Sequence, residues 1–389
     1  MMDYEKILSD KCKEIKPSGI RKFFDIASTM DDVISLGVGE PDFPTPWSIR
    51  KAAITTLEKG KTIYTANSGL LQLRDTISKY LLRKQSLEYD PKSEIIVTVG
   101  GSEAIDLGIR AVVNPGDEVL VVEPSFVCYK PIIELMHGVP VVIETKKEDE
   151  FRLTAEELRS KITERTKMLI LPFPNNPTGA VMRKSDLEEI AEVLRGTNIM
   201  VLSDEIYSEL TYGVKHVSIA QIEGMKERTL LVNGFSKSFA MTGWRLGYLA
   251  GPAPVIKQIL KIHQYAIMCS PTISQYAAIE AMNNCDGEVH KMVDEYDTRR
   301  RWLVNAFNEA GLECFEPMGA FYVFPSIRST GMSSQEFCEQ LLYKHKVAVV
   351  PGDAFGDCGE GHIRVSYAYS LSHLMNAMER IKEFLAEIK

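Results

Sequence analysis

Lys237 is a candidate reactive lysine because of the small and polar residues around it. It follows an apolar run that ends at Asn233-Gly234, and Arg245 comes eight residues later between glycines. A lysine attacks a carbonyl only when desolvation or a neighbouring cation lowers its pKa from the ordinary value of about 10.4. Arg245 is such a cation, and its guanidinium also suits a phosphate. Taken alone, Lys237 could equally be an exposed loop lysine.

Gly100-Gly101-Ser102 is a second candidate, because it follows an apolar strand and opens the next predicted helix. The first N–H groups of a helix lack partners within the helix and carry partial positive charge, which suits a phosphate. The turn has neither the Gly-Lys-Ser/Thr of a P-loop nor a G-x-G-x-x-G fingerprint, which disfavours ATP and NAD. An ordinary helix cap is the alternative.

Asn176, Asp204 and Tyr207 also follow predicted strands. Asn176 lies in the proline-rich segment 171–179, LPFPNNPTG, which either fixes one amide side chain or forms a rigid turn. Asp204 ends an apolar strand, and Tyr207 comes three residues later. A buried aspartate requires a cation or strong hydrogen bonds.

Arg364 lies between Ile363 and Val365 in a predicted strand near the C-terminus. Strand alternation points its side chain either outward to water or inward to an anion. Taken alone, a structural arginine in a salt bridge is the simpler interpretation.

Composition limits the classes of partner. The chain has 389 residues, 45% hydrophobic and 25% charged, and a net charge of −8, which argues against nucleic acid or an anionic membrane. Seven scattered cysteines without Cys-x-x-Cys spacing predict free thiols and no zinc site. Because no signal peptide or membrane-spanning run is recognisable, we expect a cytoplasmic protein that binds no metal.

The order of segments predicts an α/β fold. Short uninterrupted apolar runs alternate with helices, which indicates a mostly parallel sheet of roughly seven strands, covered by helices on both faces. The expected strands are 95–99, 119–122, 139–143, 168–171, 199–202, 230–232 and 246–250. Such sheets bind ligands beyond the carboxyl ends of their strands, where the polar residues above fall.

The pattern changes after about residue 285. A long helix follows, and Arg299-Arg300-Arg301 is expected on its solvated face. Strands at 320–324, 347–350 and 363–367 and a closing helix at 374–388 then predict a smaller α+β domain. We expect three parts: residues 1–45, an N-terminal arm with part of the small domain; 46–285, a large ligand-binding domain; and 286–389, the small C-terminal domain.

Together these residues resemble the site of the pyridoxal-phosphate (PLP) dependent aminotransferases of the aspartate aminotransferase fold, class I/II. The resemblance covers nearly the whole chain, from Gly37-Val38-Gly39-Glu40-Pro41 to Arg364. It implies PLP fold type I, with PLP bound in the large domain. The chain is similar to the branch of bacterial and archaeal aspartate and aromatic aminotransferases, and segments 19–23 and 207–212 also resemble N-acetyl-diaminopimelate aminotransferases.

The resemblance implies a role for each residue near the cofactor ring. Lys237 would bind the PLP aldehyde covalently and move the substrate's Cα proton, and Asp204 would pair with the pyridine nitrogen. Such a pair at about 4 Å is worth on the order of 4 kcal/mol at an effective dielectric of about 20, which keeps the ring protonated as an electron sink. Tyr207 and Asn176 would hydrogen-bond the ring's 3′ oxygen, and Phe126 would stack on the ring.

The remaining implied contacts concern the phosphate, the substrate and a second subunit. The phosphate would be held by Gly100, Gly101, Ser102, Ser236 and Arg245, with Tyr64 reaching in from a partner subunit. Arg364 would bind the substrate's α-carboxylate, helped by Asn176 and the Gly39 amide, and so orient Cα over the ring. A homodimer with shared active sites is implied. One departure is Gly234, where many relatives carry serine, so this position offers only a backbone donor.

We therefore expect an aminotransferase that exchanges the amino group of an aspartate- or aromatic-type L-amino acid with a 2-oxo acid, glutamate and 2-oxoglutarate forming one pair. N-acetyl-diaminopimelate transamination and a carbon–sulfur β-lyase reaction of the same fold stay open. Side-chain preference would depend on Ile20, Phe23, Tyr64 and Tyr129. A non-catalytic ligand sensor is disfavoured, because the chain is acidic and few residues precede the first strand.

Overall fold

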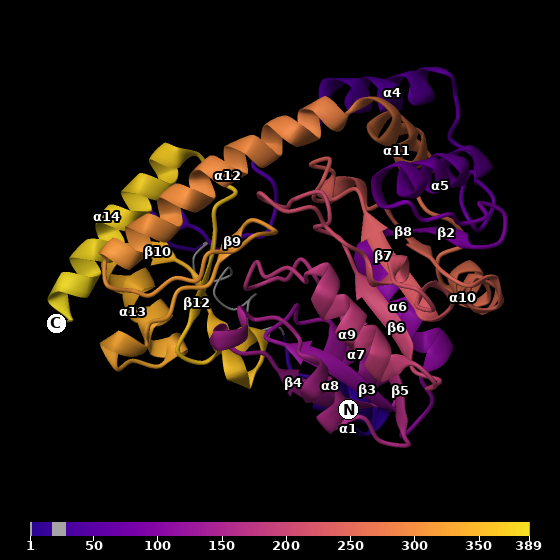
Figure 1. Cartoon of the computed structure of the whole chain (residues 1–389). Helices are drawn as coiled ribbons and strands as arrows, with labels where there is room; N and C mark the ends of the chain where they lie inside the picture. The colour runs from indigo at the N-terminus through magenta and orange to yellow at the C-terminus, as the bar shows by residue number, and fades with distance from the viewer. Residues whose placement is uncertain (1, 18–28, 389) are drawn as a thin grey trace.

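A computed structural model describes residues 2–17 and 29–388. Its centre is a seven-stranded sheet with the strand order β2-β8-β7-β6-β5-β3-β4 (Figure 1). Only β8 among these seven runs antiparallel to its neighbours. The strands are β2 (Ile95–Thr98), β3 (Glu118–Glu123), β4 (Val139–Glu144), β5 (Thr166–Leu171), β6 (Met200–Asp204), β7 (Thr229–Gly234) and β8 (Gly247–Ala250). The predicted mostly parallel sheet is confirmed.

Helices cover both faces of this sheet, because successive strand residues point to opposite sides. Val119 and Val121 of β3 pack with residues of α6 (Gly100–Val112), α7 (Tyr129–Leu135) and α10 (Ala253–Ala266). Leu120 and Val122 pack instead with residues of α8 (Ala155–Lys161) and α9 (Lys184–Leu194). Near β2, the sheet is flanked by α4 (Trp47–Glu58), α5 (Leu71–Gln85) and α11 (Thr272–Asn284).

The C-terminal part forms a smaller α+β layer beside the large sheet (Figure 1). Its antiparallel sheet has the order β11-β12-β9, and β1 from the N-terminal segment pairs in parallel with β10. The predicted strand at 347–350 is therefore split between two sheets. The elements are β1 (Ile34–Ser35), α12 (Asp286–Glu309), β9 (Tyr322–Val323), α13 (Ser334–His345), β10 (Val347–Ala348), β11 (Val350–Pro351), β12 (Ile363–Ser366) and α14 (Leu371–Glu387). We propose that the domain boundaries lie where the sequence predicts them, after residues 45 and 285.

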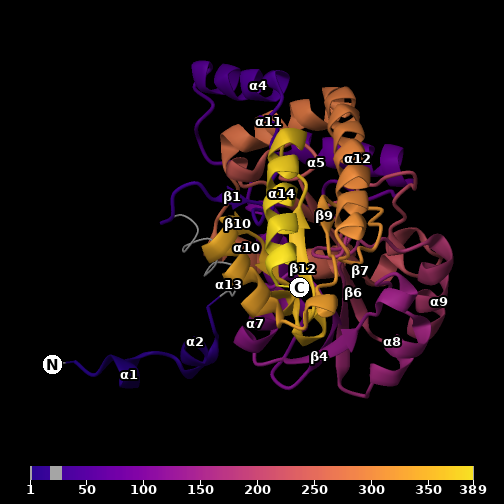
Figure 2. The ribbon, with the colours of Figure 1, turned by 90° about the vertical axis from the view of Figure 1, so that its left-hand side faces the viewer.

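The N-terminal helix α1 (Tyr4–Ile7) extends away from the main body, whereas α2 (Asp10–Glu14) contacts α7 (Figure 2). The short helix expected after residue 19, with Ile20 and Phe23, lies outside the described residues. Among the described helices, none combines the length and the apolar character needed to cross a membrane.

The expectation for Arg299-Arg300-Arg301 was wrong for two of the three residues. Arg299 and Arg300 are 5% and 4% exposed. Arg299 donates to both oxygens of Asp42 at 2.8 and 2.9 Å, and Arg300 bonds Asp297 at 2.7 Å and Glu316 at 2.8 Å. Asp42 comes from a segment far away in the sequence, Glu316 follows soon after α12, and Asp297 lies on α12 itself. Helical periodicity could not show this.

Candidate active site

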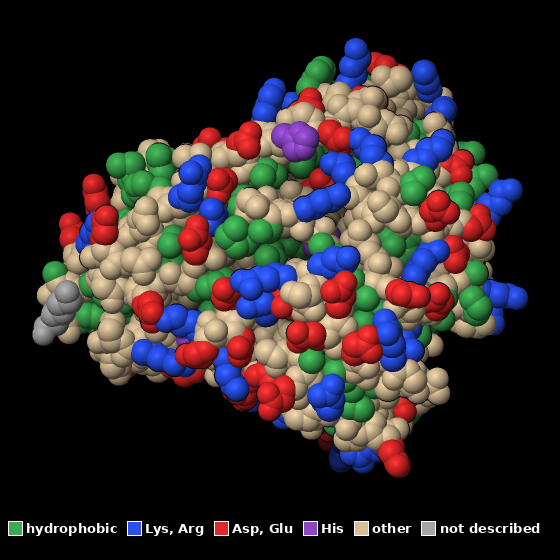
Figure 3. All heavy atoms as spheres, viewed as in Figure 1, with side chains coloured by type: hydrophobic (Ala, Val, Ile, Leu, Met, Phe, Trp, Pro, Cys, Tyr) green, Lys and Arg blue, Asp and Glu red, His purple; other side chains and the backbone are tan. Residues whose placement is uncertain are grey.

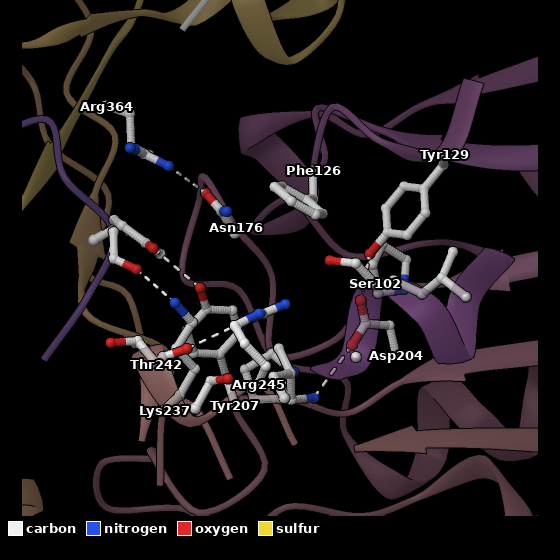
Figure 4. A pocket seen from close by; sticks show the side chains of 18 residues that line it. Ser102, Phe126, Tyr129, Asn176, Asp204, Tyr207, Lys237, Thr242, Arg245 and Arg364 are labelled. Carbon is white, nitrogen blue, oxygen red and sulfur yellow. Dashed lines mark hydrogen bonds between the residues drawn. The ribbon is translucent and has the colours of Figure 1, made fainter. Parts of the chain in front are cut away.

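A cavity of about 290 Å³ lies at the carboxyl ends of the central strands (Figure 4). Every site residue expected from the sequence lines it except Gly100, which adjoins it, and Tyr64. These lining residues are Gly39, Gly101, Ser102, Phe126, Asn176, Asp204, Tyr207, Ser236, Lys237, Arg245 and Arg364. The topology explains this assembly, because β2, β3, β5, β6 and β7 all deliver their last residues to one edge of the sheet.

Asp204 is a buried carboxylate without a cationic partner. It ends β6, is 7% exposed, and accepts hydrogen bonds from the Tyr129 hydroxyl at 2.7 Å and the Ile206 amide at 3.2 Å. Burial raises its pKa to about 6, and no residue in the described part of the chain forms an ion pair with it. The site therefore suits a ligand that brings a positive charge. Tyr129, a candidate for substrate preference from the sequence, lines the cavity and also supports this carboxylate.

Lys237 faces the same cavity and donates its Nζ proton to the Gly39 carbonyl at 2.5 Å. Burial lowers its pKa to about 8, and the positive charges of Arg364 and Arg245 add to this effect. A lysine with this pKa is partly neutral near pH 8, which a nucleophile or a base requires.

An anion cup occupies one end of the cavity, where α6 begins. Gly101 and Ser102 line it together with Ser236 and Arg245. Gly100 has φ +79°, which favours glycine, and a Cβ there would lie 2.6 Å from Arg245 Nη2 and displace this guanidinium. Gly234 is also closely packed, since a Cβ there would lie 3.1 Å from the Leu246 carbonyl oxygen. Free helix N–H groups and a guanidinium suit a phosphate.

Arg364 lies at the opposite end of the cavity and is 3% exposed. Its Nη1 donates to Asn176 Oδ1 at 3.0 Å and its Nη2 to the Gly37 carbonyl, while its buried Nε has no partner among residues 2–17 and 29–388. The interpretation as a salt-bridged structural arginine is wrong, since none of its contacts in the described residues is to a carboxylate. Its charge is left for a ligand.

Several residues that line the cavity were not predicted from the sequence: Ile105, Pro172, Pro174, Ile206, Thr242 and Tyr322. Among them, Tyr322 has its ring against the Arg364 guanidinium and its hydroxyl group against that of Tyr207. Its position depends on the pairing of β9 with β12, strands about forty residues apart, and no local pattern reveals that register. Tyr64 is 78% exposed and does not line the cavity of its own chain.

Comparison with known proteins identifies the family. Residues 31–381 match the model of the aminotransferases described as class I and II. The chain belongs to this family. It is 53% identical to YugH of Bacillus subtilis, over 97% of this chain and 98% of that protein. An aspartate aminotransferase of Pyrococcus abyssi is 48% identical over 98% and 99% of the two chains.

The solved structures of relatives have the same fold. The crystal structure of an aromatic aminotransferase from Pyrococcus horikoshii OT3 aligns with a TM-score of 0.90 and 46% identity, over 94% of this chain and 99% of that one. The protein is therefore a transaminase. In the described residues, no group of three His, Cys, Asp or Glu side chains is arranged to hold a metal ion.

Proposed function

We propose that the cavity binds pyridoxal 5′-phosphate and that the enzyme transfers the amino group of an aspartate- or aromatic-type L-amino acid to 2-oxoglutarate. One observation carries the proposal: Asp204, a buried carboxylate lacking a cation, and Lys237, with a lowered pKa, face one cavity that also contains an anion cup. These three features match the pyridine nitrogen, the aldehyde and the phosphate of one molecule.

The residues present fit this cofactor. Gly101, Ser102, Ser236 and Arg245 would hold the phosphate, and Asp204 would hold the ring nitrogen. Phe126 would cover one face of the ring, and Asn176 and Tyr207 would reach its 3′ oxygen. When bound, PLP supplies an electron sink for the carbanion at the substrate's Cα.

The side chains of the protein bind the substrate and move the proton. Arg364 would hold the α-carboxylate through its unpartnered Nε, since its other nitrogens donate to neutral acceptors. The amine of Lys237 would remove the proton from the substrate's Cα and deliver it to the C4′ carbon of the cofactor, on the other side of the intervening nitrogen. Because Asp204 and Arg364 are buried, their electrostatic contacts with a ligand are stronger than they would be in solution.

We also propose that the enzyme is a cytoplasmic homodimer. Large apolar side chains are exposed together around α4, the loop after it and the end of α10: Trp47, Ile54, Leu57, Ile63, Tyr64, Tyr265, Ile267 and Met268. An exposed apolar group of this kind suits a partner surface, and a two-fold arrangement would carry Tyr64 to the other subunit's phosphate. All seven cysteines are free thiols, as expected in a reducing compartment.

The surface is consistent with small-molecule substrates. On the face shown in Figure 3, basic and acidic side chains are interspersed and no broad basic area is present. A surface of mixed charge does not attract nucleic acid.

A substrate panel tests the proposed function. The PLP-loaded protein is mixed rapidly with glutamate, aspartate, phenylalanine, tyrosine, alanine or N-acetyl-diaminopimelate, and the visible absorption of the cofactor is followed. We expect loss of the band with glutamate and with aspartate or an aromatic amino acid, and recovery on adding 2-oxoglutarate. If glutamate does not change the cofactor band, glutamate and 2-oxoglutarate are not a substrate pair of this enzyme. Release of pyruvate, ammonia and homocysteine from cystathionine without a 2-oxo acid would indicate a β-lyase instead.

A further inference from the structure

Tyr322 lines the active-site cavity and has no role in the function proposed above. It lies on β9, directly opposite Ser366 of β12. Residues two apart on a strand share a face, so Tyr322 is the diagonal neighbour of Arg364. Its side chain is only 1% exposed, and its ring and its hydroxyl group have different partners.

The ring of Tyr322 packs against the guanidinium of Arg364. The Arg364 Cζ atom lies 4.5 Å from the centroid of this ring and 4.9 Å from the centroid of Phe355. Stacking on aromatic faces restricts the plane of a guanidinium without neutralising its charge. Since the Arg364 nitrogens bond only an amide oxygen and a main-chain carbonyl in the described part of the chain, both rings orient a charge that is left for a carboxylate.

The hydroxyl of Tyr322 has a different partner. Its oxygen lies 3.0 Å from the hydroxyl oxygen of Tyr207. A Cβ on Gly39 would lie 2.3 Å from the Tyr322 oxygen, so the glycine provides the space for this hydroxyl. Each phenol has one proton to donate. When Tyr322 donates to Tyr207, the Tyr207 proton is available to an acceptor in the cavity.

We propose that Tyr322 is a positioning residue with two separable parts: its ring orients Arg364 toward the substrate carboxylate, and its hydroxyl directs the Tyr207 proton toward the cofactor. This inference rests on the proposed function, because the carboxylate and the ring oxygen are those of the aminotransferase reaction. It goes beyond that function in assigning a residue that contacts both parts of the machinery.

Two variants of the PLP-loaded enzyme separate the two parts. Tyr322→Phe keeps the ring and removes the hydroxyl, whereas Tyr322→Leu removes both. One measurement is the dissociation constant of succinate, an unreactive carboxylate, by calorimetry. The other is the pH midpoint of the visible cofactor band. Without the Tyr322 hydroxyl, Tyr207 no longer accepts the hydrogen bond that orients its proton, and it becomes a weaker donor to the 3′ oxygen. The proton shared by that oxygen and the Lys237 nitrogen is then harder to remove, so the midpoint moves to higher pH.

We expect Tyr322→Phe to raise the midpoint by at least about half a pH unit and to leave the succinate dissociation constant within about twofold. Tyr322→Leu should raise the midpoint similarly and also weaken succinate binding about tenfold, equivalent to about 1.4 kcal/mol. Phe355→Leu, which removes the ring on the other side of Arg364, should weaken succinate binding without moving the midpoint. This variant also tests the ring contact if Tyr322→Leu does not fold.

Tyr367→Phe is the matched control. Tyr367 is fully buried in the same part of the molecule, donates to the Ala320 carbonyl at 3.2 Å, and does not line the cavity. Neither measurement should change in this variant. An unmoved midpoint in Tyr322→Phe would overturn the role of the hydroxyl, and equal succinate binding in Tyr322→Leu and the unaltered enzyme would overturn that of the ring. Failure of the proposed function is distinguishable, because the unaltered protein would then show no visible band with PLP.

Discussion

Asp204 and Lys237 are held at pKa values that disfavour their charged forms. Asp204 has a raised pKa of about 6, so the stability it provides at low pH is lost as the pH rises from about 4 to about 6. Lys237 has a lowered pKa of about 8, so the stability it provides at high pH is lost as the pH falls from about 10 to about 8. Between pH 6 and 8 the cofactor-free protein is destabilised by burying both a charged Asp204 and a charged Lys237. Bound PLP would remove both destabilising effects.

Asp204→Asn should therefore stabilise the cofactor-free protein at pH 7.5. Removing a charged group whose pKa is shifted by about two units increases the free energy of unfolding by about 3 kcal/mol. Losing one of the two hydrogen bonds to Asp204 lowers it by about 1 kcal/mol. We expect a net gain of about 2 kcal/mol in the free energy of unfolding, measured by denaturant titration, together with weaker PLP binding. The gain should vanish near pH 4. A variant less stable than the unaltered protein at pH 7.5 would show that the buried charge of Asp204 does not destabilise the cofactor-free protein.

Arg364→Ala should chiefly impair substrate binding. Truncating one partner of a buried charge pair costs about 2 to 5 kcal/mol, so kcat/KM for glutamate should fall at least about thirtyfold. Arg364→Lys keeps the charge but not the planar guanidinium between Tyr322 and Phe355, and should recover only part of the loss. Steady-state kinetics measure both. Unchanged kcat/KM in Arg364→Ala would mean that another cation binds the carboxylate.

At the residue scale, the sequence was informative where a reactive side chain follows an apolar strand. Lys237, Asp204 and Arg364 are unusual at such positions, and all three line one cavity. From the sequence, Tyr129 was a candidate for side-chain preference, and Tyr322 had no predicted role. Aromatic residues are common in cores, so only their contacts with Asp204 and Arg364 distinguish them.

At the scale of elements, α6 owes its position to a buried pair behind the anion cup. Glu103 Oε2 accepts from the Val99 amide at 2.5 Å, immediately before the helix, and its Oε1 lies 2.7 Å from Nδ1 of His263 on α10. His263 is 0% exposed. The acidic side chain thus anchors the first turn of the helix from behind.

Glu103→Ala should destabilise the protein by about 1 to 3 kcal/mol, because it leaves the Val99 amide and the His263 ring without an acceptor. PLP affinity should also fall, since the first turn of α6 loses its anchor. Thermal unfolding and equilibrium dialysis measure the two effects. Asp106→Ala on the same helix removes only an exposed ion pair with Arg110 and should change stability by less than about 1 kcal/mol. Equal stability of both variants would contradict the anchoring role.

Periodicity predicted the strands of the large sheet well, because all of them except the edge strand β4 are short runs buried on both faces. It was less informative in the smaller part, where pairing joins distant segments. The run at 347–350 serves two sheets, and Asp42 covers Arg299 from 257 residues away along the chain. Such contacts depend on tertiary arrangement rather than on local sequence.

At the scale of the whole molecule, the proposed dimer places Tyr64 in the partner's site. Tyr64→Ala and Lys237→Ala should each be nearly inactive alone. Mixed after mild dissociation, they should regain about a quarter of the unaltered activity, because half the dimers are hybrids and each hybrid has one intact site. Sedimentation velocity should show a dimer throughout. No recovery from verified hybrids would place Tyr64 outside the partner's site.

The central claim is that Lys237 binds PLP covalently through its aldehyde. The PLP-loaded protein is reduced with borohydride, digested and analysed by peptide mass spectrometry. The added mass of the reduced cofactor should be found on the peptide containing Lys237, and Lys237→Ala should carry none. A label on another lysine, or no label on protein saturated with PLP, would contradict the account.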